Sequence, residues 1–405
     1  MNILDISPYA VYPPNAGGRL RIHYLNTNAA KFGHNVSIFS QDILNINEIN
    51  LNYVKKIPIA PNYVEYRYIN VFSLMVNYIT GSLLRVSKIL TGDILKILRP
   101  QILYKLIQNC NVIKIEHPWQ FPYVFSKKPK DTPIVLVEHN AEFELYNNFL
   151  TFSKDPLLKP IRKPLVNIAI EKERFAVENA HIIFTVSEED KNKLVKEYGI
   201  NKSKFYVIPN GVDISKFCPI SPENKEDLKK SMGFEGRKII LFSGSRYPPN
   251  EEAVHKIIEF SKKLKNQKDI IFLIVGTVGT LFKDKKYPNV IFTGYVNDVT
   301  KYFQIADIAI NPMLSGSGTN IKMLDYMASG LPIITTKVGA RGLNLEHGKH
   351  VIISEIDEFP EWIEILLENE DLRYKLSTNG RKLVEEKYDW KKIAEKELKI
   401  LEKIV

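Results

Sequence analysis

The stretch Asn311–Thr336, NPMLSGSGTNIKMLDYMASGLPIITT, places a glycine-containing loop between two apolar runs. The run DIAINP before the loop predicts a buried strand, NIKMLDYMA predicts a helix, and LPIITT predicts the next strand. Gly316 and Gly318 cannot build a core, but they let a backbone come close to a ligand. This strand, loop, helix and strand are typical of one unit of a parallel sheet.

The same kind of apolar run recurs along the whole chain. Runs without polar alternation, separated by helical patterns, indicate strands that are buried on both faces of parallel sheets. The others are NILDIS, HNVSIF, NVIKIE, PIVLVEH, HIIFTVS, KIILFSG, IIFLIVG, NVIFTG and HVIIS. The predicted fold class is therefore α/β.

The runs form two sets, and a linker-like stretch, VIPNGVDISKFCPISPENKED, lies between them. A chain of 405 residues is longer than one core usually supports. We therefore predict Rossmann-like domains at 1–209 and 210–389. An apolar stripe in 390–405 predicts a last helix that needs a surface to pack on.

Composition limits the class of ligand. The net charge of +10 favours anionic ligands such as phosphates, nucleic acid or a membrane surface. Two distant cysteines, Cys110 and Cys218, predict neither a disulfide framework nor a cysteine zinc site, and fit a reducing cytoplasm. The chain opens without a signal-peptide pattern. The apolar stretch Val71–Val86 is interrupted by polar residues and is too short for a membrane span.

Lys322 and Asp325 follow the glycine loop on the predicted helix, three residues apart. A glycine loop that enters a helix offers free N–H groups to an anion. We expect the lysine to bind a phosphate and the aspartate to accept hydrogen bonds from two sugar hydroxyls. The alternative is a surface ion pair between the two side chains.

Two further glycine loops follow predicted strands. Gly17 and Gly18 come after the first strand, before a helix expected from about Arg19, and could let backbone approach a diphosphate or a sugar. Arg246 follows Gly244 at the end of a buried strand, where its donors could stabilise charge on a leaving diphosphate. A tight turn and a salt bridge are the respective alternatives.

Histidines mark the ends of two strands in the N-terminal half. His117 and His139 each follow a buried run, so they are candidates for a functional role, although each alone could be structural. The remaining six histidines are expected to be structural. No D-x-D motif, hydrolase elbow, nucleotide-binding P-loop or zinc spacing occurs, so a metal ion is not implied.

With these residues assembled, the chain resembles the retaining glycosyltransferases of family 4 along nearly its whole length. The segments that carry the resemblance include VEHNAEFE, VIPNGVDISKF, PPNEEAV, FTGYVNDV and SGSGTNIKMLDYMASGLPIITTKVGARGL. The resemblance implies the GT-B fold, in which two Rossmann-like domains face across a central cleft. It also implies that the final helix crosses back to the N-terminal domain.

The resemblance also assigns roles to individual residues. Lys322 and Arg246 would bind the diphosphate, and Asp325 would replace a glutamate that holds the ribose. His139 would lie beside the transferred sugar. Backbone at Gly318, Thr319 and Asn320 would contact phosphate or sugar, and backbone at Tyr295 and Val296 would touch the base. Many family members carry another glutamate at the position of Ser317, so sugar recognition must differ here.

The resulting hypothesis is a metal-independent, retaining transfer of a sugar from a nucleoside-diphosphate donor to a hydroxyl acceptor, without a further cofactor. The acceptor could be a glycan, a small molecule or a lipid-linked sugar. We expect a cytoplasmic protein that does not bind nucleic acid, and peripheral attachment to the inner face of the membrane stays open. A non-catalytic nucleotide-sugar binder and a UDP-sugar 2-epimerase of the same fold are the alternatives.

Overall fold

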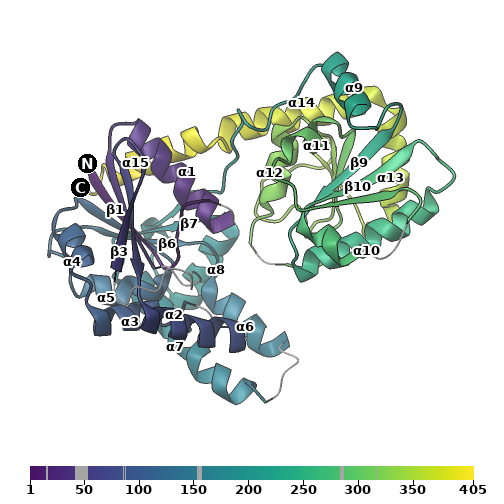
Figure 1. Cartoon of the computed structure of the whole chain (residues 1–405). Coiled ribbons are helices and arrows are strands. Elements are labelled where there is room, and N and C mark those ends of the chain that lie inside the picture. The colour runs from purple at the N-terminus through teal and green to yellow at the C-terminus, as the bar shows by residue number, and fades with distance from the viewer. Residues whose placement is uncertain are drawn as a thin grey trace. The chain divides into compact units, whose positions relative to one another are not determined.

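The computed structural model describes residues 1–14, 17–41, 53–84, 86, 88–152, 157–282, 287–316 and 318–405. The chain forms two compact units. Unit 1 contains residues 1–209 together with 393–405, and unit 2 contains residues 210–392. Each unit is an α/β structure with one sheet between helices (Figure 1).

Unit 1 contains a sheet of eight described strands in the order β3-β4-β2-β1-β5-β6-β7-β8. The strands are β1 (Asn2–Ser7), β2 (Asn35–Gln41), β3 (Tyr53–Ala60), β4 (Tyr63–Ile69), β5 (Val112–Glu116), β6 (Ile134–Glu138), β7 (Ile182–Thr185) and β8 (Phe205–Val207). The helices are α1 (Gly17–Lys31), α2 (Val71–Tyr78), α3 (Thr91–Leu98), α4 (Gln101–Gln108), α5 (Phe121–Phe125), α6 (Glu142–Phe152), α7 (Lys159–Asn179), α8 (Glu188–Tyr198) and α15 (Trp390–Leu401). Short helical turns are η1 (Ile79–Leu83), η2 (Pro118–Gln120) and η3 (Lys202–Lys204).

The two faces of this sheet are covered by different helices. A core cluster joins alternate strand residues such as Leu4 and Ile113 to α3, α4, α5, α7 and α8. On the other face, Asn26 of α1 donates to Asp5 of β1, and Glu397 of α15 pairs with Lys114 of β5. The last helix therefore packs on unit 1, as the resemblance implied.

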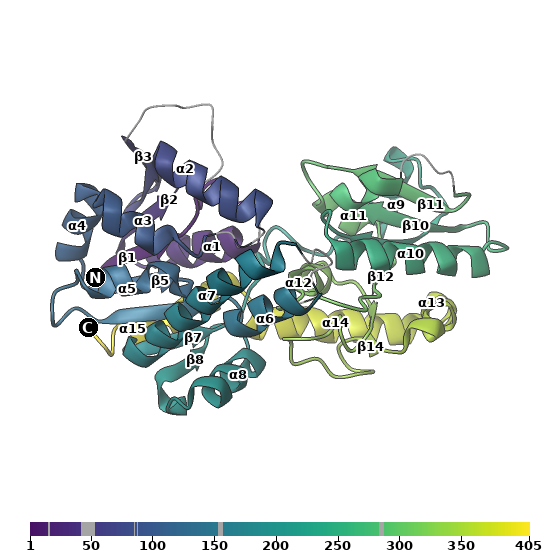
Figure 2. The same ribbon diagram turned by 90° about the horizontal axis from the view of Figure 1, so that it is seen from below.

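Unit 2 contains a sheet of six parallel described strands in the order β11-β10-β9-β12-β13-β14 (Figure 2). They are β9 (Lys238–Ser243), β10 (Ile270–Val275), β11 (Val290–Gly294), β12 (Ile308–Asn311), β13 (Ile333–Thr335) and β14 (Ile352–Ile353). The helices and turns are α9 (Pro222–Ser231), α10 (Pro248–Lys263), η4 (Thr277–Phe282), α11 (Thr300–Gln304), α12 (Ile321–Ala328), η5 (Ile356–Glu358), α13 (Phe359–Glu368) and α14 (Glu370–Lys387). One face packs on α11 and α12, and the other on α10 and α13.

The α/β prediction is confirmed, and all eleven predicted runs contain strands. Three strands, β3, β4 and β8, were not predicted, and β3 pairs antiparallel with β4, so the first sheet is not wholly parallel. β3 carries Lys55, Lys56 and Pro58 and lies at the sheet edge, where polar and proline residues are tolerated. Helix α1 begins at Gly17, two residues before the predicted start. In the described part of the chain, no helix is both long and apolar enough to cross a bilayer.

Candidate active site

The carboxyl ends of β9, β10 and β11 in unit 2 meet through closely packed backbone. Gly276 has φ of +108°, and a Cβ atom on it would lie 2.4 Å from the carbonyl oxygen of Gly244. The Gly276 N–H donates to Gly294 O at 3.1 Å. Just after Gly244, the N–H of Arg246 donates to Thr277 Oγ1 at 2.9 Å. Glycine at 276 is therefore needed for these strand ends to pack so closely, and they lie at the edge where α/β sheets commonly bind their ligands.

The loop after β12 is held by a residue that the sequence analysis did not single out. Arg341 donates from Nε and Nη2 to Gly318 O, at 3.1 and 3.0 Å. A Cβ atom on Gly342 would lie 2.6 Å from Thr319 Oγ1, so the backbone at Gly342 packs directly against the side chain of Thr319. Gly316 and Gly318 both have positive φ, 126° and 70°. The backbone at Gly316 and at Gly318 therefore adopts a conformation that favours glycine.

Helix α12 carries a lysine, Lys322, that has no carboxylate partner among the described residues. Asn320, the N-cap residue, makes no side-chain capping bond, so backbone N–H groups of the first turn are not capped in that way. Lys322 Nζ donates to Asn250 Oδ1 at 2.8 Å and lies 4.2 Å from the ring centroid of Phe242. Burial lowers the pKa of Lys322 to about 7. In the described part of the chain no ion pair joins Lys322 to Asp325, so the surface ion-pair alternative is wrong.

The other residues predicted for unit 2 lie around the same edge. Burial raises the pKa of Asp325 to about 7, and the nearby Lys216 opposes this shift. Arg246 is exposed and forms no ion pair within the described residues. Tyr295, after β11, is 74% exposed, whereas Val296 packs on the core. Ser317 lies outside the described residues.

In unit 1, three ring side chains meet at the carboxyl ends of β1, β5 and β6. The rings of His117 and His139 stack with centroids 4.4 Å apart. Tyr9 Oη lies 3.3 Å from His117 Nε2, and His117 Nδ1 lies 2.8 Å from Glu142 Oε1, at the start of α6. The structure therefore brings together the two strand-end histidines, and Glu142 orients one of them.

Gly17 and Gly18 form the start of α1 beside this cluster. A Cβ atom on Gly18 would lie 2.5 Å from Tyr9 Oη and 3.5 Å from His139 Nδ1. A side chain at this position therefore collides with Tyr9. The absence of a Cβ at Gly18 lets the helix start approach the ring cluster, so the glycine has a packing reason beyond a tight turn.

His139 has its orientation fixed by a carboxylate. Its Nε2 lies 2.5 Å from Glu116 Oε2, and both side chains are buried. Burial and the neighbouring His117 lower the pKa of His139 well below its ordinary value. We assign the proton to Nε2, which donates to Glu116, because the ring is neutral near pH 7. Nδ1 then remains an acceptor, and no hydrogen bond to it is present among the described residues.

Behind Glu116 lies a buried group of charges. Lys114 Nζ lies 2.8 Å from Glu397 Oε1, 3.3 Å from Asp5 Oδ2 and 4.0 Å from Glu116 Oε1. Burial acts to lower the pKa of Lys114, but the carboxylates of Asp5 and Glu397 raise it above its usual range. Lys114 therefore stays charged and links the last helix, through Glu116, to His139.

Substitution of Gly18 by alanine is expected to destabilise the protein by about 1–3 kcal/mol, because the new methyl group overlaps Tyr9 Oη. Thermal unfolding measures the loss. The double variant Gly18→Ala with Tyr9→Phe should recover most of it, since removal of the hydroxyl clears the space. Equal unfolding temperatures for the single variant and the wild type would contradict this packing.

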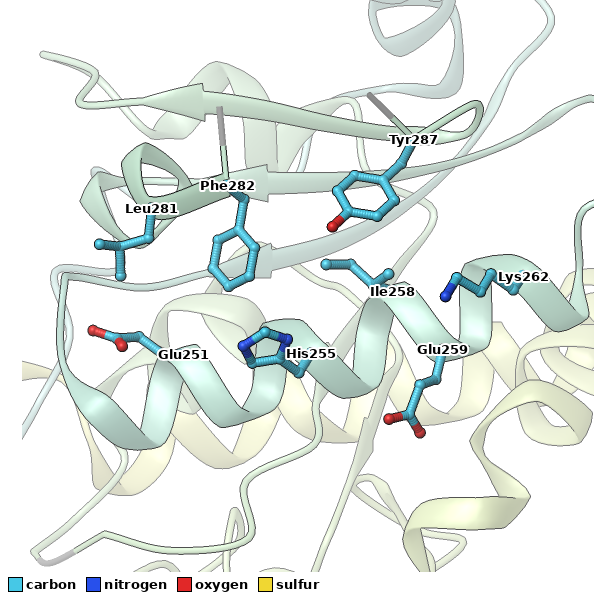
Figure 3. Close-up of a pocket in the computed structure, with 8 residues that line it drawn as sticks. All are labelled: Glu251, His255, Ile258, Glu259, Lys262, Leu281, Phe282 and Tyr287. Atoms are coloured by element: carbon cyan, nitrogen blue, oxygen red, sulfur yellow. The ribbon is translucent and has the colours of Figure 1, made fainter. Parts of the chain in front are cut away.

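A separate groove of about 430 Å³ lies between α10 and the facing segment that carries Leu281, Phe282 and Tyr287 (Figure 3). Its lining combines acidic, basic and aromatic side chains from Glu251, His255, Ile258, Glu259, Lys262, Leu281, Phe282 and Tyr287. The His255 ring packs edge-on against Phe282 at 5.1 Å, so its expected structural role agrees with its contacts. None of the predicted site residues lines this groove.

The described residues thus form an α/β protein with a cluster of glycines, Lys322 and Asp325 at the carboxyl edge of the sheet in unit 2, and a histidine cluster at the carboxyl edge of the sheet in unit 1. Residues 17–216 match the family described as Glycosyltransferase Family 4, and residues 237–369 match the family described as Glycosyl transferases group 1. The chain belongs to these glycosyltransferases.

The identity to an individual curated relative is low and covers only part of the chain. The chain is 26% identical over 207 residues to the UDP-Gal:alpha-D-GlcNAc-diphosphoundecaprenol alpha-1,3-galactosyltransferase of Escherichia coli, and the alignment covers 48% of this chain and 52% of the relative. The chain thus spans about half the length of this curated relative.

Solved structures share the fold over the whole chain. The sucrose-phosphate synthase of Thermosynechococcus elongatus has a TM-score of 0.74 at 14% identity, covering 100% of this chain and 99% of that one. The HepE protein of Anabaena in complex with UDP has a TM-score of 0.69 at 14% identity, covering 100% of both chains. The GT-B fold assignment is confirmed.

Proposed function

We propose that this protein transfers a sugar from a nucleoside-diphosphate donor to a hydroxyl acceptor, with retention of the anomeric configuration. The observation that carries the proposal is the amine of Lys322, at the start of α12. This amine donates a hydrogen bond to Asn250 of α10 and has no carboxylate partner in the described part of the chain. A partly buried amine in that state is stabilised by a bound anion.

In the proposed reaction, the bond between the anomeric carbon and the diphosphate oxygen breaks, and the acceptor oxygen forms its bond on the same face. Lys322, Arg246 and the N–H groups at the start of α12 stabilise the charge that develops on the diphosphate. The departing phosphate oxygen takes the acceptor proton. These cationic groups supply the charge stabilisation, so we propose that no metal ion is needed.

We propose a role for each cluster of residues in binding the donor, and then a class of acceptor. We propose that Asp325 accepts hydrogen bonds from the donor ribose, and that Tyr295 and Val296 contact the base through their backbone. His139 and the Gly17–Gly18 helix start are proposed to contact the sugar. We propose a lipid-linked acceptor, because the E. coli relative is named for a diphosphoundecaprenol acceptor. The protein would then act on the cytoplasmic side of a membrane.

Two assays test the proposal. Calorimetry of the full chain against UDP, GDP, ADP and CDP without metal should show one preferred nucleoside diphosphate. Sugar conjugates of that nucleotide should then be consumed only when an acceptor is present. Donor binding without transfer to any acceptor would indicate a non-catalytic binder, and sugar interconversion without an acceptor would indicate an epimerase. Failure of all four nucleotides to bind would overturn the assignment of unit 2.

A further inference from the structure

Helix α2 has the opposite polarity to an ordinary surface helix. Its polar side chains Ser73 and Asn77, and Thr80 in the following turn, are buried. Its large apolar side chains are exposed, Met75 by 52% and Tyr78 by 59%. The exposed apolar set, at the spacing of one helical face, is Val71, Phe72, Met75, Tyr78 and Ile79. An apolar face of this kind indicates a binding surface.

The inner side of α2 carries much of its own hydrogen bonding. Asn70 Oδ1 accepts from the Ser73 N–H at 3.2 Å, Asn77 Nδ2 donates to Ser73 O at 2.9 Å, and Thr80 Oγ1 donates to Val76 O at 2.9 Å. Only Asn77 Oδ1 is buried without a partner among the described atoms of these four polar residues. Burying these polar side chains therefore costs little free energy, because most of their polar atoms are hydrogen-bonded.

The start of α7 adjoins this helix and adds positive charge. Arg162 Nε donates to Leu84 O at 2.9 Å, which joins α7 to the end of the turn after α2. Leu157, two residues before α7 begins, is 84% exposed, and Ile161 in the first turn of α7 is 53% exposed. Lys159 and Lys163 of α7 are also exposed. The sequences 71–92 and 157–170 contain no aspartate or glutamate. The charged side chains within these two segments are therefore all basic.

We propose that α2 and the first turns of α7, the docking face, bind the surface of an anionic lipid bilayer. Phe72, Met75 and Tyr78 enter the boundary between headgroups and acyl chains, and Lys159 and Lys163 contact lipid phosphates. An exposed apolar helix face flanked by lysines is the pattern of an interfacial helix. A second copy of the chain would bring the same basic residues together, so charge favours lipid over self-association.

The proposed docking rests on the proposed function in one respect: it would bring the chain to a lipid-linked acceptor. Lipid binding itself requires no catalysis. A chain that binds vesicles but transfers no sugar would overturn the proposed function alone, and a transferase that stays in the supernatant would overturn the docking alone.

The test is sedimentation of the full chain with vesicles of phosphatidylcholine alone or mixed with phosphatidylglycerol, at low and high salt. The wild type should sediment with the anionic vesicles at low salt. The variant Met75→Ser/Tyr78→Ser and the variant Lys159→Glu/Lys163→Glu should each bind at least about tenfold more weakly. Tyr374→Ser, which replaces a 73% exposed tyrosine of α14, is the matched control and should bind as the wild type does.

Thermal unfolding and nucleotide binding should be unchanged in all variants, because the replaced side chains are exposed and none is a candidate site residue. Recovery of the wild type only in the supernatant would overturn the proposal, as would undiminished binding by Met75→Ser/Tyr78→Ser. A wild-type dimer that this variant converts to a monomer, without vesicle binding, would assign the face to self-association instead.

Discussion

Replacement of Lys322 by alanine is expected to weaken binding of the preferred nucleoside diphosphate roughly 10- to 100-fold, while binding of the free nucleoside changes little. The reason is that the ammonium of Lys322 is held by Asn250 and the ring of Phe242, and no carboxylate within the described residues competes with an anion for it. Isothermal calorimetry with both ligands measures the difference.

Lys301→Ala is the matched control, because Lys301 is an exposed lysine of α11 in the same unit. It should bind both ligands as the wild type does. Equal losses of nucleoside and nucleoside-diphosphate affinity in Lys322→Ala would remove the lysine from the phosphate site.

The titration of Lys322 should contribute proton uptake when the nucleoside diphosphate binds. Because its pKa in the free protein is about 7, and a bound diphosphate stabilises the ammonium, the lysine taken alone should take up a proton on binding near pH 7 and should strengthen binding as pH falls through 7. Asp325 acts in the opposite direction, since its pKa is also about 7 and ribose hydroxyls favour its ionised form. Asp325→Asn therefore isolates the uptake, which calorimetry in two buffers of different ionisation enthalpy would show. No uptake in this variant would contradict the proposed role of the amine.

The sequence predicted the fold well because the decisive strands are buried on both faces. Such strands appear as unbroken apolar runs, and each predicted run contains a strand. The missed strands β3 and β4 carry lysines, an arginine and a glutamate, because they lie at and beside the sheet edge, and β8 has only three residues. Glu65 of β4 is buried by bonds to the N–H groups of Val11 and Tyr12, which are distant in sequence.

The candidate site was predicted in part. Glycines and charged residues at strand ends stand out in a sequence, and the structure places Gly18 against His139 and Gly244 beside Asn250. Arg341, Asn250 and Glu116 were missed because their roles depend on partners that the fold supplies. Arg341 carried one available signal, its place in the glycine-containing segment VGARGL.

Substitution of His139 by alanine is expected to lower kcat for sugar transfer by about 100-fold or more, with little change in the affinity for the nucleoside diphosphate. Glu116 fixes the ring through Nε2, and the neutral ring leaves Nδ1 as an acceptor for a sugar hydroxyl. The proposed diphosphate site lies in unit 2, on other residues, so nucleotide binding should survive the change.

His255→Ala provides the control, because it removes an exposed histidine of the α10 groove in Figure 3 and should leave kcat unchanged. The pH profile of kcat tests whether the His139 ring stays neutral. Since burial lowers the pKa of His139 well below its usual range, kcat of the wild type should show no loss from this ring as pH falls from 8 through about 6.5.

Glu116→Gln keeps a side chain of the same size but loses the charge that favours the Nε2–H tautomer, so its kcat should fall between those of the wild type and His139→Ala. If His139→Ala lost transfer and nucleotide affinity in equal measure, or if Glu116→Gln behaved as the wild type, the ring would be holding the fold of unit 1 rather than the sugar.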